Sequence, residues 1–457
     1  MFQNPVRRFV SEVNIFVLSI IVTFLVLGLF SYNAQAQLIC DFTQVTDNDR
    51  TITSRLNISS QGNHVAFESF DDITGDNDDD SQEVFLFDNT NKSTTQITPN
   101  DKPGFHGLPS MNFDASLIAL QSTSDLDPGS NIDGNFEIFL YNVASDTFTQ
   151  ITDTTGIDIA TANIGPIITP DGTRIVFNSG KDLVPTDNDD ENKEVFVFDV
   201  GMNFTQITDT TGGSIGDNNP SSISSDGSRI LFGSSIDILP PNNNDENSEI
   251  FLFDETTGID QITDTVINVL GARLSSDGAT VVLISNDDIV TGENSDNGRE
   301  VFLFDIATMT FTQITDTNDA NGNNFNASIN ADGTRIAFYS KIDHSGTGKN
   351  ADGNLELFVY ETDSMFFTQV TDTMGGNIPL NPSPTDMNAV GNRIVFESDR
   401  DLTGDNPDED TLIFLADCIP NIVSTPIPTL SKWGLIALAG TLGIVGYLVI
   451  RRRKVTA

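Results

Sequence analysis

Two stretches of the sequence place acidic side chains at alternating positions, a spacing that could bind a metal ion. The acids are Asp76, Asp78, Asp80 and Glu83 in the first stretch, and Asp187, Asp189, Glu191 and Glu194 in the second. Calcium takes about six to eight oxygen ligands, which carboxylates on a turn can supply. Neither stretch has the central Gly and the final Glu of an EF-hand loop. Calcium is the cofactor that these two stretches predict.

The same loops also have a structural interpretation. Asn-x-Asp occurs at corresponding places in seven loops, beginning at Asn77, Asn131, Asn188, Asn243, Asn294, Asn350 and Asn406. Asn and Asp side chains stabilise tight turns by bonding to nearby backbone groups. We therefore expect turn capping from the repeated Asn-x-Asp pair, and calcium binding stays open for the two richer loops.

Catalytic chemistry has little support in the sequence. There is no Gly-x-Ser-x-Gly elbow, no His-Glu-x-x-His and no Gly-rich phosphate loop. The three histidines, His64, His106 and His344, lie in different loops or strands and have no evident partners. Carboxylates facing each other could hydrolyse sugars, but acids are too abundant here to indicate a specific pair. No catalytic residue is predicted.

The overall charge excludes one class of partner. The 457 residues include 22 Lys and Arg against 66 Asp and Glu, which gives a formal net charge of −44. A chain this acidic does not offer the basic surface that nucleic-acid binding requires. Because 38% of the residues are apolar, the chain still has material for a large core.

Internal repeats predict the elements that position these residues. Gln-(Ile/Val)-Thr begins at Gln44, Gln96, Gln150, Gln206, Gln261, Gln313 and Gln369. Six units also contain a Glu-apolar-Phe string, and the seventh has a degraded copy that starts at Leu412. An Asp-Gly turn precedes an apolar strand in four units, as at Asp171-Gly172, with weakened forms in the other three. Units of about 50 residues with four strand-like segments and no helical periodicity are typical of propeller blades. We predict an all-β, seven-bladed β-propeller over residues 37–420, with a β-solenoid as the main rival.

The two ends of the repeat region complement each other. The region starts with only the last strand of a unit, residues 41–46, and its seventh unit stops after the third strand, residues 412–417. Pairing these two segments would complete one blade and remove an exposed sheet edge. Cys40 and Cys418 fall at this junction, so we predict a disulfide between them, the alternative being two free thiols.

The repeats resemble a known family. Residues 224–232 and 204–208 are similar to the repeats of TolB-like propellers, which are related to WD-repeat proteins. The resemblance covers nearly all of residues 41–417, and it implies a scaffold that usually binds partners and is sometimes attached to a hydrolase domain. TolB itself has six blades and an additional N-terminal domain, so a role in the Tol-Pal system is not implied.

The N-terminus is predicted to direct export. Arg7 and Arg8 precede an uncharged apolar run, residues 15–30, and Ala34-Gln35-Ala36 follows it. This is the layout of a secretory signal peptide, predicted here as residues 1–36, and an uncleaved anchor is the alternative.

The C-terminus resembles the IPTL-type sorting domain. Residues 421–433 form a linker with the motif, residues 434–450 are predicted to span a membrane, and the basic tail 451–457 is predicted to stay in the cytoplasm. The motif residues are Ile427, Pro428, Thr429, Leu430, Trp433 and Gly434, with Lys432 where the usual Glu would stand. The resemblance implies a Gram-negative bacterium and a sorting enzyme as a partner. A plain single-span anchor is the alternative.

Together these features predict an exported, membrane-tethered or surface-sorted propeller of the cell envelope. Its expected role is a non-catalytic binding or structural module with an acidic face for calcium, a protein or a glycan. The alternative is a secreted polysaccharide or peptide hydrolase or lyase with its site at the channel mouth.

Overall fold

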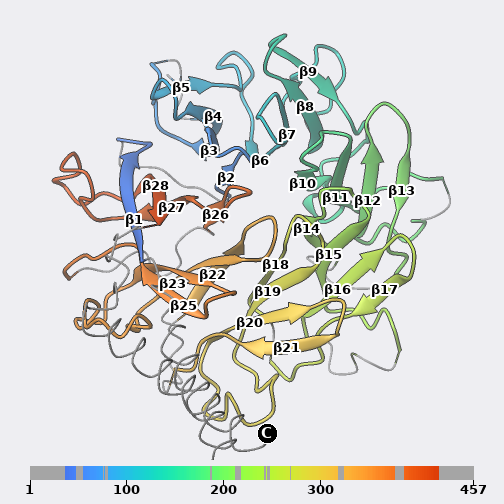
Figure 1. The fold of residues 1–457 in the computed structure, drawn as a ribbon. Helices are drawn as coiled ribbons and strands as arrows, with labels where there is room; N and C mark the ends of the chain where they lie inside the picture. The colour runs from blue at the N-terminus through green and yellow to red at the C-terminus, as the bar shows by residue number, and fades with distance from the viewer. Residues whose placement is uncertain are drawn as a thin grey trace, which may run out of the picture. The chain divides into compact units, whose positions relative to one another are not determined.

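The structure, a computed structural model, describes residues 37–47, 55–75, 77, 81–185, 188–211, 218–240, 243, 247–267, 269–317, 324–375 and 385–420. Within them, residues 38–419 belong to one compact unit built from seven four-stranded sheets. The sheets are arranged as blades around a central axis (Figure 1). The predicted all-β fold with seven four-stranded blades is confirmed.

The blades follow one another along the chain, each running from an inner to an outer strand. Blade 1 contains β2 (Asn57–Ile58), β3 (His64–Ser69), β4 (Glu83–Asp88) and β5 (Ser93–Gln96). Blade 2 contains β6 (His106–Met111), β7 (Leu117–Ser122), β8 (Glu137–Asn142) and β9 (Thr147–Gln150). Blade 3 contains β10 (Ile164–Ile168), β11 (Arg174–Ser179), β12 (Glu194–Asp199) and β13 (Phe204–Gln206), with the short 3-10 helix η1 (Ile159–Thr161) before it.

The remaining blades repeat this plan. Blade 4 contains β14 (Asn219–Ile223), β15 (Arg229–Ser234), β16 (Glu249–Asp254) and β17 (Gly258–Gln261). Blade 5 contains β18 (Gly271–Leu274), β19 (Thr280–Ser285), β20 (Glu300–Asp305) and β21 (Thr310–Gln313). Blade 6 contains β22 (Asn324–Ile329), β23 (Arg335–Ser340), β24 (Glu356–Glu361) and β25 (Phe366–Gln369). Blade 7 contains β26 (Asp386–Met387), β27 (Arg393–Ser398), β28 (Leu412–Pro420) and β1 (Leu38–Gln44).

The core lies between neighbouring blades, because successive side chains of a strand point to opposite faces of its sheet. In β12, Val195 and Val197 pack in a cluster with Phe232 of blade 4. Phe196, between them, packs instead with Ile138 of blade 2. Each blade therefore needs an apolar neighbour on both sides, which explains why the third strands are almost continuously apolar.

Arginines at the start of the second strands tie one blade to the next. Arg174 donates from Nε to Asp199 at 2.8 Å in its own blade and from Nη1 to the carbonyl of Gly227 in blade 4 at 3.0 Å. Gly227 has a positive φ of 73°, and a Cβ there would lie 2.5 Å from Cδ of Arg174. Glycine is therefore required in this Asp-Gly turn, both because φ is positive and because the Arg174 side chain leaves no room for a Cβ.

The first and last strands of the repeat region lie in the same sheet. β1 is the neighbour of β28, and Val45 donates its backbone N–H to Ile413 at 2.8 Å. Cys40 and Cys418 form a disulfide, as predicted, and they are 378 residues apart. Ile413 also packs in one cluster with Val65 of blade 1.

The other predicted segments fall outside the described residues. These are the signal peptide, the sorting motif, the membrane helix and the basic tail. Among the residues that the structure describes, no helix is long and apolar enough to cross a membrane.

Candidate functional site

The repeated loops gather on one face of the propeller, which we call the loop face. It consists of the loops between the second and third strands and the connections that lead from one blade to the next. The two sets of loops contact each other, since Gly156 of a connection donates to Asp133 of a loop at 3.3 Å, and Gly375 donates to Asp352 at 3.0 Å. The loop face therefore presents matching residues from successive blades.

The Asn of each Asn-x-Asp pair is a buried turn cap. Each Asn donates from its side chain to the backbone carbonyl four residues later, at 2.9 to 3.1 Å. The seven residues are Asn77, Asn131, Asn188, Asn243, Asn294, Asn350 and Asn406, none more than 5% exposed. A buried amide that holds its own loop has a structural role.

The Glu that begins the third strand is also buried, and it holds two blades together. Glu194 accepts from the backbone and the hydroxyl of Thr210, at 2.7 and 2.5 Å. It also accepts from Nδ2 of Asn218, at the start of blade 4, at 3.1 Å. Burial raises the pKa of this carboxyl above its usual range. The same bond to a Thr backbone is made by Glu137, Glu249, Glu300 and Glu356.

The acids between these buried groups are exposed. The middle residue of the Thr-Asp-Thr sequence that leads out of a blade is exposed at Asp153, Asp209, Asp264, Asp316 and Asp372. The Asp of the Asn-x-Asp pair is exposed at Asp133, Asp190, Asp352 and Asp408. At these positions the motifs enclose polar neighbours and present a carboxylate to solvent.

The predicted calcium ligands do not converge among the described residues. Glu83 and Glu194 are buried at the start of strands β4 and β12, whereas Asp189 and Glu191 are exposed in their loop. Asp76, Asp78, Asp80 and Asp187 lie outside the described residues. Within the described part of the chain, no group of three His, Cys, Asp or Glu side chains could hold a metal. Calcium binding stays a prediction.

A Ser-His-Glu arrangement between blades 1 and 2 was not expected from the sequence. His106 lies 2.9 Å from the Ser122 hydroxyl through Nδ1, and its Nε2 lies 3.8 Å from Glu83. All three side chains are fully buried, and Nε2 also lies 2.9 Å from the carbonyl of Lys102. His106 stands beside Glu83 of blade 1 as Asn218 stands beside Glu194 of blade 3, but at 3.8 Å rather than 3.1 Å. Burial at this depth argues against a nucleophile.

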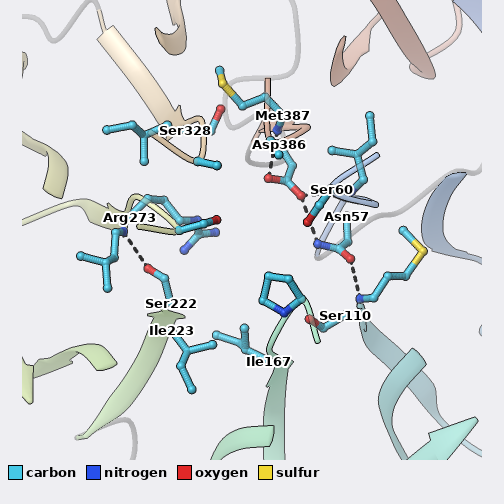
Figure 2. Close-up of a pocket in the computed structure, with 18 of the residues that line it drawn as sticks. Asn57, Ser60, Ser110, Ile167, Ser222, Ile223, Arg273, Ser328, Asp386 and Met387 are labelled. Atoms are coloured by element: carbon cyan, nitrogen blue, oxygen red, sulfur yellow. Dashed lines mark hydrogen bonds between the residues drawn. The ribbon is translucent and has the colours of Figure 1, made fainter. Parts of the chain in front are cut away.

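The inner strands enclose a channel along the axis. Its cavity has a volume of about 160 Å³, and one residue of each inner strand forms a collar around it. The collar residues are Asn57, Ser110, Ile167, Ser222, Arg273, Ser328 and Asp386 (Figure 2). Ser110 accepts from Ile168 N–H at 3.1 Å, so collar side chains can bond to the inner strand of the next blade.

Asp386 is the one carboxylate among the described residues that line this cavity. It accepts hydrogen bonds from Asn57 Nδ2 and Ile58 N–H, both at 3.0 Å. Burial raises its pKa, and the positive charge of Arg273 opposes that shift. A glycoside hydrolase needs two carboxyl groups flanking its substrate, and the described channel lining supplies one.

The fold and the C-terminal sequence define the class of this protein. It is a seven-bladed β-propeller that carries an IPTL-type sorting signal, because residues 425–454 match the model of the IPTL-CTERM motif. This motif points to an exported, surface-sorted protein.

Comparison with other proteins adds partial likenesses. No curated protein sequence matches the chain significantly. TolB from Acinetobacter baumannii is 17% identical, with a TM-score of 0.39, over 65% of this chain and 61% of that chain. Hydrazine synthase from Kuenenia stuttgartiensis is 12% identical, with a TM-score of 0.45, over 80% of this chain and 96% of that chain. This chain thus spans less than two thirds of the TolB structure, and neither likeness indicates what it binds.

Proposed function

We propose that this protein is a non-catalytic binding module, displayed at the cell envelope, whose loop face binds a cationic partner. The observation that carries the proposal is the recurrence of exposed carboxylates at matching positions of successive blades. Such an array attracts positive charge and repels negative charge over the whole face.

The environment of these carboxylates supports a binding role. On the loop face, the described ion pairs of exposed acids are Lys349 with Asp372 at 3.8 Å and Arg400 with Glu409 at 3.1 Å. Asp153, Asp209 and Asp264 form no ion pair with another described residue. Acids that need no partner for folding are available to a ligand.

The proposed topology exports the propeller together with its loop face. In it, pairing of β1 with β28 closes the ring, residues 1–36 direct export, and residues 434–450 anchor the chain until a sorting enzyme acts on the motif. The final compartment would be the envelope or surface of a Gram-negative bacterium. We also propose, as a more specific part of this function, that the loops around Asp78 and Asp189 bind calcium.

The alternative function is a hydrolase or lyase for polysaccharides or peptides at the channel mouth. It requires a small number of acids to carry nearly all the activity. The loop face instead distributes its carboxylates over many loops, which favours a binding module.

The test compares two faces of the same protein. We would measure binding of an oligolysine peptide to the full-length chain and to Asp153→Asn/Asp209→Asn/Asp264→Asn. The matched control, Asp146→Asn/Asp260→Asn/Asp363→Asn, removes three exposed charges away from the loop face. We expect the first variant to bind at least about tenfold more weakly and the control to bind nearly as wild type. Equal losses in both variants would contradict a dedicated binding face.

A further inference from the structure

Three arginines around the channel have no ion pair with another described residue. Arg55 and Arg273 line the central cavity. Arg273 and Arg299 also line a second cavity, of about 370 Å³, beside Phe325. Arg273 therefore belongs to both cavities. By contrast, the arginines that tie blades together each pair with an acid, as Arg229 does with Asp254 at 2.7 Å.

The three guanidinium groups retain most of their hydrogen-bond donors. Arg55 donates from Nη1 to the carbonyl of Pro166 at 2.9 Å, and Arg273 donates from Nη1 to that of Ser221 at 3.2 Å. A guanidinium carries about five N–H donors, so one bond each leaves the remainder for another acceptor. Arg299 stacks over the ring of Phe325 at 4.7 Å, and its buried Nε has no partner among the described residues.

The nearest acids are already held by other donors. Asp386 accepts from Asn57 and from the N–H groups of Ile58 and Met387. Glu68 accepts from the N–H of Leu108 at 2.9 Å. Both acids offset part of the arginine charge, yet neither forms an ion pair with Arg55 or Arg273 within 4.0 Å. The cost of enclosing these cations is therefore only partly compensated.

The electrostatics agree with this geometry. Burial and the like charge of Arg273 together lower the pKa of Arg55 to about 10, against the opposing influence of Glu68 and Asp386. Burial also lowers the pKa of Arg273 and of Arg299. An added anion would relieve both the desolvation and the repulsion between the guanidinium groups.

We propose that the channel is a binding site for a small oxyanion, a carboxylate or phosphate group, held between Arg273 and Arg55, with Arg299 at the adjoining cavity. The planar guanidinium fork matches the paired oxygens of either group. A cavity of about 160 Å³ admits a group of this size rather than a folded partner. The site is independent of the proposed cationic partner, which would bind the exposed acids of the loop face.

The test is calorimetric titration of the full-length chain with inorganic phosphate and, separately, with acetate. We expect at least one of these anions to bind, and either Arg273→Gln or Arg55→Gln to weaken it by about tenfold or more. The two anions distinguish a phosphate source from a carboxylate source, and binding of either supports the site. Arg229→Gln is the matched control, since it removes an arginine that has an ion pair outside the channel.

Two results would overturn the proposal. The first is that neither anion binds the wild-type chain at millimolar concentration. The second is that binding survives both Arg273→Gln and Arg55→Gln. A thermal melt without anion checks folding of the variants, and we expect both channel variants to melt near the wild type because they lose no ion pair. If one does not fold, the other still tests the site.

Discussion

In blades 1 to 6, a buried carboxylate at the start of the third strand links neighbouring parts of the propeller. In Glu194, one oxygen accepts from Thr210 and the other from the amide of Asn218. In Glu249, one oxygen accepts from Thr265 and the other from the hydroxyl of Thr263. The hydroxyl can reverse its role from donor to acceptor, whereas the amide nitrogen cannot. The side chain of Thr208 also bonds to Glu194, so among the described residues the Asn218 amide is the contact that sets the two sites apart.

This difference gives a prediction at the residue scale. We expect Glu249→Gln to cost little, because the new amide can donate to Thr263. We expect Glu194→Gln to cost about 1–3 kcal/mol more, because in either orientation its NH₂ group meets the N–H of Thr210 or Nδ2 of Asn218. Urea denaturation of the two variants measures the difference. Equal losses of stability would show that the partners of these carboxylates do not matter.

At the scale of elements, the sheet of blade 7 depends on two strands from opposite ends of the repeat region. β1 and β28 are neighbours in it, and Cys40 and Cys418 join them covalently. Ile413 donates its N–H to the hydroxyl of Thr46 at 3.0 Å, so noncovalent contacts extend beyond the disulfide. Without β1, the edge of β28 would be exposed and open to pairing with another chain.

The prediction for this element concerns the disulfide. Because the bond closes a loop of hundreds of residues, we expect Cys40→Ser/Cys418→Ser to lower the free energy of unfolding by up to about 5 kcal/mol. Chemical denaturation under oxidising conditions measures this loss, and wild-type protein with reductant should match the variant. An unchanged denaturation midpoint in the double variant would mean that noncovalent pairing of β1 suffices.

At the scale of the whole molecule, two groups of carboxyls respond to pH in opposite ways. Burial raises the pKa of Glu137, Glu194, Glu249 and Glu300 above the usual 4.5. The folded state then binds these protons more tightly than the unfolded chain, so stability rises as pH falls toward 4.5. Hydrogen bonds from Ser224 and Ser228 lower the pKa of Asp226 from 3.8 to about 2, so that contribution is lost as pH falls below 3.8.

We therefore predict that the protein is most stable in mildly acidic solution. Its Tm should be higher near pH 5 than at pH 7.5 and should fall steeply below about pH 4. Protonation of exposed acids also reduces their mutual repulsion, so the melts should be repeated at high salt to separate that effect. Glu249→Gln should show a smaller rise than wild type. A Tm that declines steadily from neutral pH downward would contradict the raised carboxyl pKa values.

The propeller and its blade number could be predicted from the sequence because repeats and strand composition are local patterns. The disulfide could be predicted because the two end segments of the repeat region complement each other and each has a Cys beside it. The roles of individual acids could not, because Glu194 and Asp190 are both acids near one loop, yet one is buried and the other is exposed. Their burial depends on partners such as Thr210 and Asn218, which other segments supply. The Thr-Asp-Thr repeats were visible in the sequence and could have indicated those partners.

The placement of arginines at the channel could not be predicted from the sequence either. Arg273 belongs to the short inner strand β18, and Arg55 lies just before the inner strand β2. Four other inner strands pair irregularly with their neighbours. The alternation of inward and outward residues is shifted at such irregularities, so the inner surface cannot be read from the sequence pattern alone.

The central claim is that the loop face binds through charge shared among blades. The most direct measurement is the affinity of an oligolysine peptide for five full-length variants, each with one Asp→Asn change. The positions are Asp153, Asp209, Asp264, Asp316 and Asp372. We predict small and similar losses at every position, because each acid supplies one part of a common field. Loss of all binding at one position, with the other four unaffected, would contradict the claim and indicate a single localised site.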